Sequence, residues 1–189
     1  PKESGEFVEY CNGKKETVWG RKRCERGYEE PYHVKFWSLG NEFGLGHMEG
    51  PNTPNAYSEK ALLCAKKMKE ADALIVGSPV YWASPSGQII EFMDKLCSMA
   101  SKDMLHKPAA AVASARRAGT TATLDVLQKY FSYHEMPVVS ANYWNMVHGN
   151  TPAEVQQDEE GLQIMRTLGS NMAWLLKSLE AGKAAGIAV

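Results

Sequence analysis

A repeated alternation of strand-like and helix-like segments constrains this 189-residue chain more than any other feature. Short apolar runs alternate with longer runs in which apolar residues recur at helical spacing. Because a strand, a helix and a further strand usually form a right-handed crossover between parallel strands, this order predicts an α/β domain with a parallel sheet of about four strands. The expected strands are residues 34–39, 73–78, 109–114 and 137–141, and the expected helices are residues 54–71, 84–96, 121–134 and a last one that stops near residue 182.

The expected α/β domain covers residues 34–180, with an irregular segment before it and a tail after it. In the first segment, residues 1–33, a short helix is expected to end at Gly13, and the mixed charges of residues 14–33 indicate a solvated loop. The tail, residues 181–189, is expected to be loosely held.

Composition argues against several classes of partner. The net charge of −1 leaves no large basic surface to neutralise phosphates, so nucleic acid is not an expected partner. The apolar runs are shorter than the roughly 20 residues of a membrane helix, so no membrane is expected. The four cysteines lack C-x-x-C spacing, which favours reduced thiols in a cytoplasmic protein, and the scattered histidines predict no metal site.

One loop is longer and richer in aromatic residues than a structural turn requires. The stretch GSPVYWASPSGQ, residues 77–88, follows an apolar strand and precedes an amphipathic helix. Open α/β sheets bind ligands at this position, beyond the carboxyl ends of their strands. Tyr81 and Trp82 offer flat apolar surface to a ligand ring, and the alternative is that both rings fill the core or a dimer interface.

Residues 71–180 resemble flavodoxin-like NAD(P)H-dependent FMN reductases and their iron–sulfur flavoprotein relatives. The matching stretches are ADALIVGSPVYWASPSGQIIEFMDK, SARRAGTTATLDVL and MPVVSANYWNMVHGNTPAEVQQDEEGLQIMRTLGSNMAWLLK. The resemblance implies a flavodoxin-like three-layer fold that lacks the usual edge strand. It also implies FMN and NAD(P)H as cofactors, a small-molecule electron acceptor and a homodimer.

Two loops of that family embrace the isoalloxazine ring of FMN. Carried over to this chain, the ring-binding residues are Pro79, Val80, Tyr81, Trp82, Ser84, Ala115, Arg116, Arg117 and Gly119. Arg116 or Arg117 would stabilise negative charge on reduced flavin, or either one is a surface charge. Trp144 and His148 are placed just past the expected fourth strand at the same sheet edge, with core packing and an exposed loop position as their respective alternatives. No catalytic acid–base pair is required, because the cofactor carries the reaction.

The first seventy residues are similar to a different family, the α-L-arabinofuranosidases, which are retaining glycosidases built on a (β/α)₈ barrel. The similar stretches are EFVEYCNG, TVWGRKR, EPYHVKFWSLGNE and GHMEGPNTPNAYSEKALLCAKKMKE. The resemblance makes Glu42 of the Asn41–Glu42 pair the acid/base. Retaining hydrolysis needs a second carboxylate from a later barrel strand, and that strand is absent. The chain therefore looks chimeric, with residues 34–71 as a grafted strand, loop and helix.

The graft replaces the part of the flavin family that holds the FMN phosphate. The family's GSPRxxGNT-type loop is missing, and Gly50, Asn52 and Thr53 are the candidates for its role, with a leftover loop without ligand as the alternative. The expected function is an FMN-dependent NAD(P)H oxidoreductase that is impaired by this loss. The alternatives are a non-catalytic α/β module without cofactor and a remnant of a glycoside hydrolase.

Overall fold

The computed structural model describes residues 9–32 and 54–187 of the chain. The chain divides into two compact units, residues 1–50 and residues 51–189. The expected first strand at 34–39 lies outside the described residues. So do the Asn41–Glu42 pair and the phosphate-loop candidates Gly50, Asn52 and Thr53.

The first unit contains helix α2, Val18–Glu25, in the charged stretch that was expected to be a loop. The side chain of Thr17 accepts a hydrogen bond from the backbone N–H of Gly20 and caps the helix start. Residues 9–12 are also helical, and Gly13 follows them as expected. The loop prediction is wrong because Arg23, one of the charges in this run, is fully buried instead of solvated.

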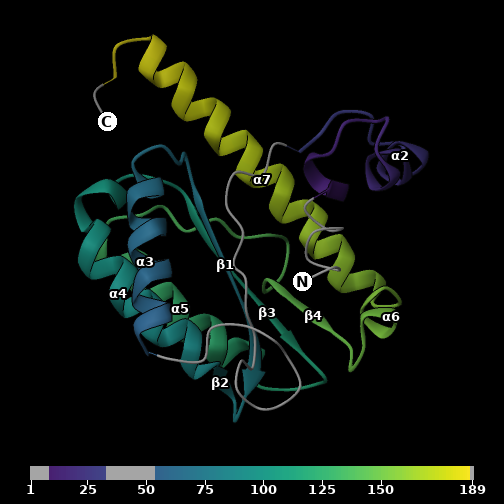
Figure 1. Cartoon of the computed structure of the whole chain (residues 1–189), viewed down its shortest axis with the longest axis horizontal. Coiled ribbons are helices and arrows are strands. Elements are labelled where there is room, and N and C mark those ends of the chain that lie inside the picture. The colour runs from purple at the N-terminus through teal and green to yellow at the C-terminus, as the bar shows by residue number, and fades with distance from the viewer. Residues whose placement is uncertain (1–8, 33–53, 188–189) are drawn as a thin grey trace. The chain divides into compact units, whose positions relative to one another are not determined.

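The second unit is built on a four-stranded sheet with the order β2-β1-β3-β4 (Figure 1). The strands are β1 Leu74–Tyr81, β2 Ser84–Pro85, β3 Ala109–Ala115 and β4 Met146–His148. Strands β1, β3 and β4 are parallel, as the strand–helix alternation predicts, and the two-residue β2 pairs antiparallel with the end of β1. The helices are α3 Pro54–Met68, α4 Gly87–Met104, α5 Thr120–Tyr133, α6 Pro152–Val155 and α7 Glu159–Ala184.

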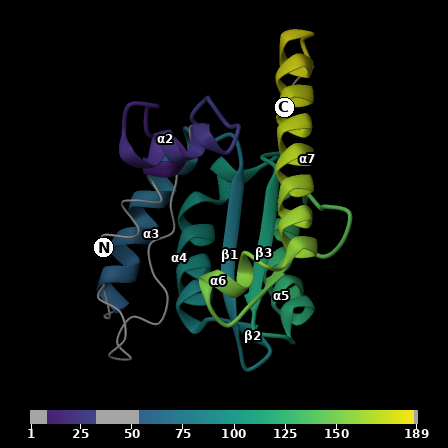
Figure 2. The same ribbon diagram turned by 90° about the vertical axis from the view of Figure 1, so that its right-hand side faces the viewer.

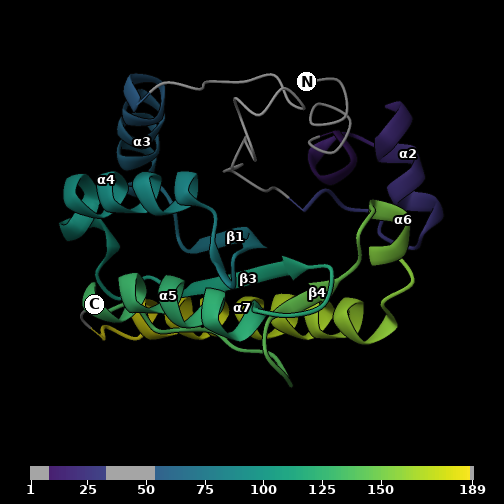
Figure 3. The same ribbon diagram turned by 90° about the horizontal axis from the view of Figure 1, so that it is seen from below.

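Helices cover both faces of the sheet (Figure 2). The crossover helix α5 packs on β1 and β3, while α4 packs against α3 (Figure 3). On the opposite face, Leu168 and Met172 of α7 form a buried cluster with Ala110 of β3 and with Val139. Every second residue of a strand points to the same face, so β3 can bury small side chains under helices on both sides. Among the described residues, no helix is long and apolar enough to cross a membrane.

Two boundaries differ from those expected from sequence. Residues 137–141 form only one parallel bridge, between Val138 and Ala109, and the last strand is Met146–His148. The pair Ser84–Pro85 forms β2 instead of opening a helix, and α4 begins later, with the Ser86 side chain accepting the backbone N–H of Ile89.

Candidate functional site

The strands β1 and β3 end side by side, which places the two predicted flavin loops at one edge of the sheet. Pro79 is the register partner of Ser114, and Ala115 is the register partner of His148 on β4. The backbone N–H of Gly149, the residue after β4, donates to the carbonyl of Ala115, so the pairing of β3 with β4 continues to the end of both strands. The carboxyl ends of three parallel strands therefore lie together, at the position where open α/β sheets bind ligands.

The first loop is a tight hairpin that holds Trp82 in solvent. Trp82 and Ala83 adopt φ angles of 52° and 57° in the left-handed region, which non-glycine residues rarely occupy. The Trp82 side chain is fully exposed. Behind the hairpin, the buried Ser78 hydroxyl accepts the backbone N–H of Ser86 and donates to the carbonyl of Pro79. Backbone strain of this kind persists only where the surrounding structure holds it, and it clusters at functional sites.

The second loop touches the first through Gly119. This glycine has a φ of 88°, and a Cβ built on it would lie 2.8 Å from both the Ala83 Cα and the Val80 Cγ1 atoms. A larger residue here would be strained and would push the hairpin away. Gly119 is also the N-cap of α5, and no side chain caps this helix start. The structure therefore brings Pro79–Ser84 and Ala115–Gly119 into direct contact, with the first backbone amides of α5 beside them.

The remaining candidate residues lie at different places. Arg116 and Arg117 are exposed between β3 and Gly119. His148 lies at the expected sheet edge, next to Ala115, but it is the half-buried last residue of β4 and not an exposed loop residue past the last strand. Trp144 precedes β4 instead of following the last strand, so its expected placement at that edge is wrong, and its side chain is 59% exposed instead of packed in the core.

Asp158 ties the end of β4 to the start of α7. Its carboxylate accepts the backbone N–H groups of His148 at 2.7 Å and Gly161 at 2.9 Å, and it lies 3.9 Å from the Nδ1 atom of His148. The hydrogen bond from Gly161 lowers the pKa of Asp158 most strongly, partial burial opposes this effect, and the backbone and charge of His148 lower the pKa further. Asp158 was not among the residues predicted from sequence, although an aspartate before a helix is a recognisable N-cap signal.

The described residues at this edge fit the ring of a flavin. The exposed indole of Trp82 can cover a flat apolar face, and the uncapped start of α5 presents backbone amides to an electronegative ring edge. The exposed guanidinium groups of Arg116 and Arg117 lie on the same loop. The residues expected to hold the FMN phosphate fall outside the described residues, so this fit concerns the ring half of the cofactor.

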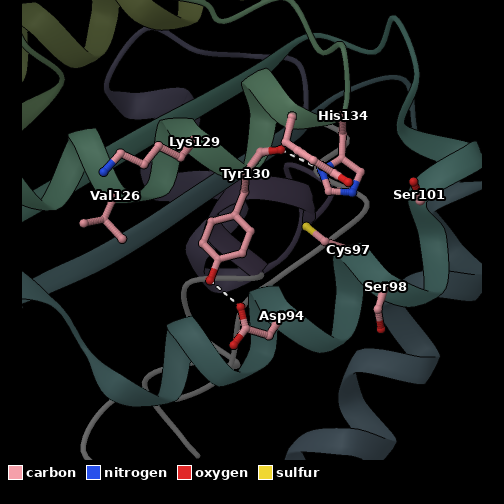
Figure 4. A pocket seen from close by; sticks show the side chains of 9 residues that line it. Asp94, Cys97, Ser98, Ser101, Val126, Lys129, Tyr130 and His134 are labelled. Carbon is pink, nitrogen blue, oxygen red and sulfur yellow. Dashed lines mark hydrogen bonds between the residues drawn. The ribbon is translucent and has the colours of Figure 1, made fainter.

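A large cavity of about 680 Å³ lies away from these loops, between α4 and α5 (Figure 4). The Tyr130 hydroxyl donates to the Asp94 carboxylate at 2.5 Å, and burial together with this bond raises the pKa of Tyr130. Burial raises the pKa of the Cys97 thiol to about 12, so this cysteine is unreactive at neutral pH. None of the predicted flavin residues lines this cavity.

A smaller cavity of about 350 Å³ lies between α5 and the segment that leads into β4. It begins at Thr121, two residues after Gly119, and Tyr143 and Trp144 form part of its wall. We call it the aromatic cavity. Of its lining, only Trp144 was singled out from sequence, because the cavity depends on the path of the chain before β4 and no local motif reports that path.

Three known proteins show what the chain is similar to. It is 33% identical to an iron–sulfur flavoprotein of Methanocaldococcus jannaschii over 61% of this chain and 64% of that protein. It is 45% identical to a probable α-L-arabinofuranosidase C of Aspergillus niger over 37% of this chain and 14% of that protein. The apo structure of an NADH:FMN oxidoreductase matches with a TM-score of 0.50 at 20% identity, over 67% of this chain and 66% of that one.

These similarities confirm both resemblances inferred from sequence. The flavoprotein likeness and the structural match agree with the expected flavodoxin-like α/β fold, and the arabinofuranosidase likeness, in the N-terminal part, agrees with a chimeric chain. A family profile described as NADPH-dependent FMN reductase matches residues 22–151, which extends the flavin resemblance further towards the N-terminus than residue 71. FMN and NAD(P)H are the cofactors of that family. The chain thus belongs to the NADPH-dependent FMN reductase family.

Proposed function

We propose that the second unit binds FMN at the contact between Pro79–Ser84 and Ala115–Gly119, and that it is an oxidoreductase using NAD(P)H and a small-molecule electron acceptor. The observation that carries this proposal is the direct approach of Gly119 to Val80 and Ala83 at the carboxyl edge of the sheet. Membership of the FMN reductase family supports it. A homodimer and a cytoplasmic location are parts of the proposal that rest on the sequence alone.

The chain's own residues supply binding and electrostatics, whereas bound FMN would accept a hydride and pass the electrons on. The fully exposed Trp82 indole would cover one flat face of the ring and exclude water from it. Backbone amides at the start of α5 would bind the polar edge of the ring, and Arg116 or Arg117 would offset negative charge on it. We assign no catalytic acid or base, because hydride transfer to a flavin is carried by the cofactor and requires no acid–base pair from the protein.

The absence of the family phosphate loop should weaken the hold on FMN. Each lost charge-assisted hydrogen bond to an ionic group costs on the order of 1.5–3 kcal/mol, and a bound phosphate normally accepts several. We therefore expect FMN to leave during purification and to return when it is added in excess. Riboflavin, which lacks the phosphate, should bind nearly as well as FMN in a fluorescence titration of the purified chain.

A pair of variants tests the position of the site. Trp82→Ala should weaken the binding of riboflavin and of FMN about equally, because it removes ring contact only. Trp174→Ala is the matched control, since Trp174 is also exposed but lies on α7. If neither flavin binds at any attainable concentration, or if Trp82→Ala leaves both affinities unchanged, the flavin site is wrong and a module without cofactor takes its place. FMN that co-purifies stoichiometrically and binds far better than riboflavin would show that residues 41–53 do hold phosphate.

A further inference from the structure

The aromatic cavity next to α5 has features of a built binding site. The segment before β4, which contributes Tyr143 and Trp144 to the cavity, is held in place by the nearly fully buried Asn145. The Asn145 side chain accepts the backbone N–H of Ala141 at 3.2 Å and donates to the carbonyl of Val139 at 3.3 Å. Asn171 of α7 also donates to the carbonyl of Ser140 at 2.8 Å. The backbone that carries the cavity's aromatic residues is therefore fixed before any ligand arrives.

This braced segment presents two aromatic rings to solvent. Tyr143 and Trp144 are 56% and 59% exposed, and their ring centroids lie 6.1 Å apart. Exposing two adjacent large rings on a braced segment forgoes the burial that usually stabilises such residues. Rings of this kind serve as stacking surfaces for flat ligands, and base–aromatic stacking accounts for a large part of the affinity where nucleobases bind.

The wall of the cavity formed by α5 carries polar side chains that can form hydrogen bonds, and one of them is charged. Thr121, Asp125 and Gln128 lie on one side of α5 at a spacing of four and three residues, and all three line the cavity. A glutamine amide has a donor and an acceptor, and a carboxylate accepts from an exocyclic amine. Among the described lining residues, Asp125 alone is charged, so the interior favours a neutral base and disfavours phosphate.

We propose that the aromatic cavity binds an adenine base, and that this base is the adenosine end of NAD(P)H. The second half of the statement rests on the proposed function, whereas the fit of the cavity to an adenine base does not. The amide of Gln128 can pair with the ring nitrogen and amine of adenine, the pairing that glutamine makes with adenine in nucleic acids. Asp125 accepts from the same exocyclic amine.

The position of the cavity agrees with a dinucleotide that reaches from the flavin edge. Thr121 follows Gly119 by two residues, and the helix from Thr121 to Gln128 spans roughly 10 Å at 1.5 Å per residue. Arg116 and Arg117 are exposed just before Gly119 and outside the cavity. The base then lies along α5, the phosphates lie towards the two arginines, and the nicotinamide lies at the contact of the two loops.

Calorimetric titration of adenosine into the purified chain without flavin tests the cavity directly. Adenosine should bind more tightly than inosine, which lacks the exocyclic amine, and Asp125→Ala should reduce this preference, with the part due to Gln128 remaining. Trp144→Ala should weaken adenosine binding about tenfold, whereas Trp174→Ala should not change it. Absence of adenosine binding at millimolar concentration, or equal effects of the two tryptophan variants, would overturn the assignment.

Two further titrations separate the possible sources of the base. ADP should bind more tightly than adenosine, and the double variant Arg116→Gln with Arg117→Gln should remove that gain without changing adenosine affinity. NADH should compete with adenosine for the same site; if ADP binds and NADH does not compete, the cavity serves a free nucleotide and the dinucleotide assignment is wrong. If adenosine and NADH bind but no flavin binds, the proposed function fails while the cavity assignment holds.

Discussion

The two units of this chain are stabilised in opposite ways. In the first, the fully buried guanidinium of Arg23 donates to four backbone carbonyls, those of Tyr10, Gly13, Tyr28 and Glu29, at distances of 2.8–3.1 Å. In the second, the buried residues are mainly small and aliphatic, such as Ala109, Ala111 and Leu127, each 0% exposed. In the described part of the first unit, residues 9–32, one polar side chain joins several backbone segments, whereas many apolar contacts share this role in the second unit.

This difference determines how each unit should respond to substitution. A buried carbonyl that loses a donor carries a desolvation penalty wherever water cannot replace that donor. Removing one side chain that bonds several backbone segments therefore affects all of them at once. An apolar contact that is lost leaves a cavity whose cost depends on how far the neighbours can relax. The structure of residues 9–32 should therefore be lost completely on one substitution, whereas the second unit should lose stability in graded steps.

The largest expected effect is that of Arg23→Met. Methionine fills similar space but donates no hydrogen bond, so four carbonyls lose a donor at about 1–3 kcal/mol each wherever water cannot replace it. Hydrogen exchange followed by mass spectrometry should show complete loss of protection in residues 9–32 and unchanged protection in residues 109–115. Arg23→Lys is the control, because an ammonium keeps the charge and some of the donors. Unchanged exchange in residues 9–32 of Arg23→Met would contradict this account.

A smaller and differently placed effect is expected for Leu127→Ala. Leu127 lies on α5 and is fully buried, so truncation should cost about 2–5 kcal/mol of the unfolding free energy of the second unit. Urea denaturation should show an earlier midpoint, and exchange should rise in β3 and α5 but not in residues 9–32. Leu62→Ala is a matched control at an exposed position of α3 and should change the midpoint little. Equal loss of protection in both units would remove the contrast between them.

The same contrast explains which parts of the fold could be predicted from the sequence. Strand β3 is an almost continuous apolar run and is buried along most of its length, as such runs indicate. Strand β1 begins with an apolar run too, but only Val76 and Ser78 are buried in it and Ile75 is exposed. Helix α2 was missed because a buried arginine and a solvated one look alike in a charged run. The position of β4 was missed because the buried amide of Asn145 fixes the preceding segment, and a polar residue gives no signal of burial.

The candidate site was predictable to a similar extent. Its two loops follow from strand order, since the carboxyl ends of neighbouring parallel strands meet at one edge. The hairpin at Trp82 and Ala83 was not predictable, because left-handed turns are usually signalled by Gly or Asn and neither is present here. The contact of Gly119 with that hairpin, and the cavity beside α5, depend on tertiary packing that one sequence does not encode in a local pattern.

The smallest expected effect concerns acid, and it acts only within the second unit. The ordinary pKa of an aspartate is about 3.8, and hydrogen bonds from the backbone hold the pKa of Asp158 below that value in the folded state. A depressed folded pKa means that the unfolded chain binds a proton first as the pH falls. The stabilisation is therefore fully present above the unfolded pKa and is lost as the pH falls through the folded pKa.

Asp158→Asn removes the titrating group, and its single amide oxygen can keep the capping bond from Gly161 but not the second bond from His148 as well. The two proteins are therefore compared by the slope of stability against pH and not by their stability at neutral pH. Urea denaturation at a series of pH values from 7 to 3 should show a shallower loss of stability below about pH 4 in the variant than in the unchanged chain. The second unit should thus owe part of its acid sensitivity to a single capping carboxylate between β4 and α7. Identical pH profiles for the two proteins would show that the hydrogen bonds of Asp158 are not coupled to its charge, and that the link between the sheet edge and α7 is maintained by packing alone.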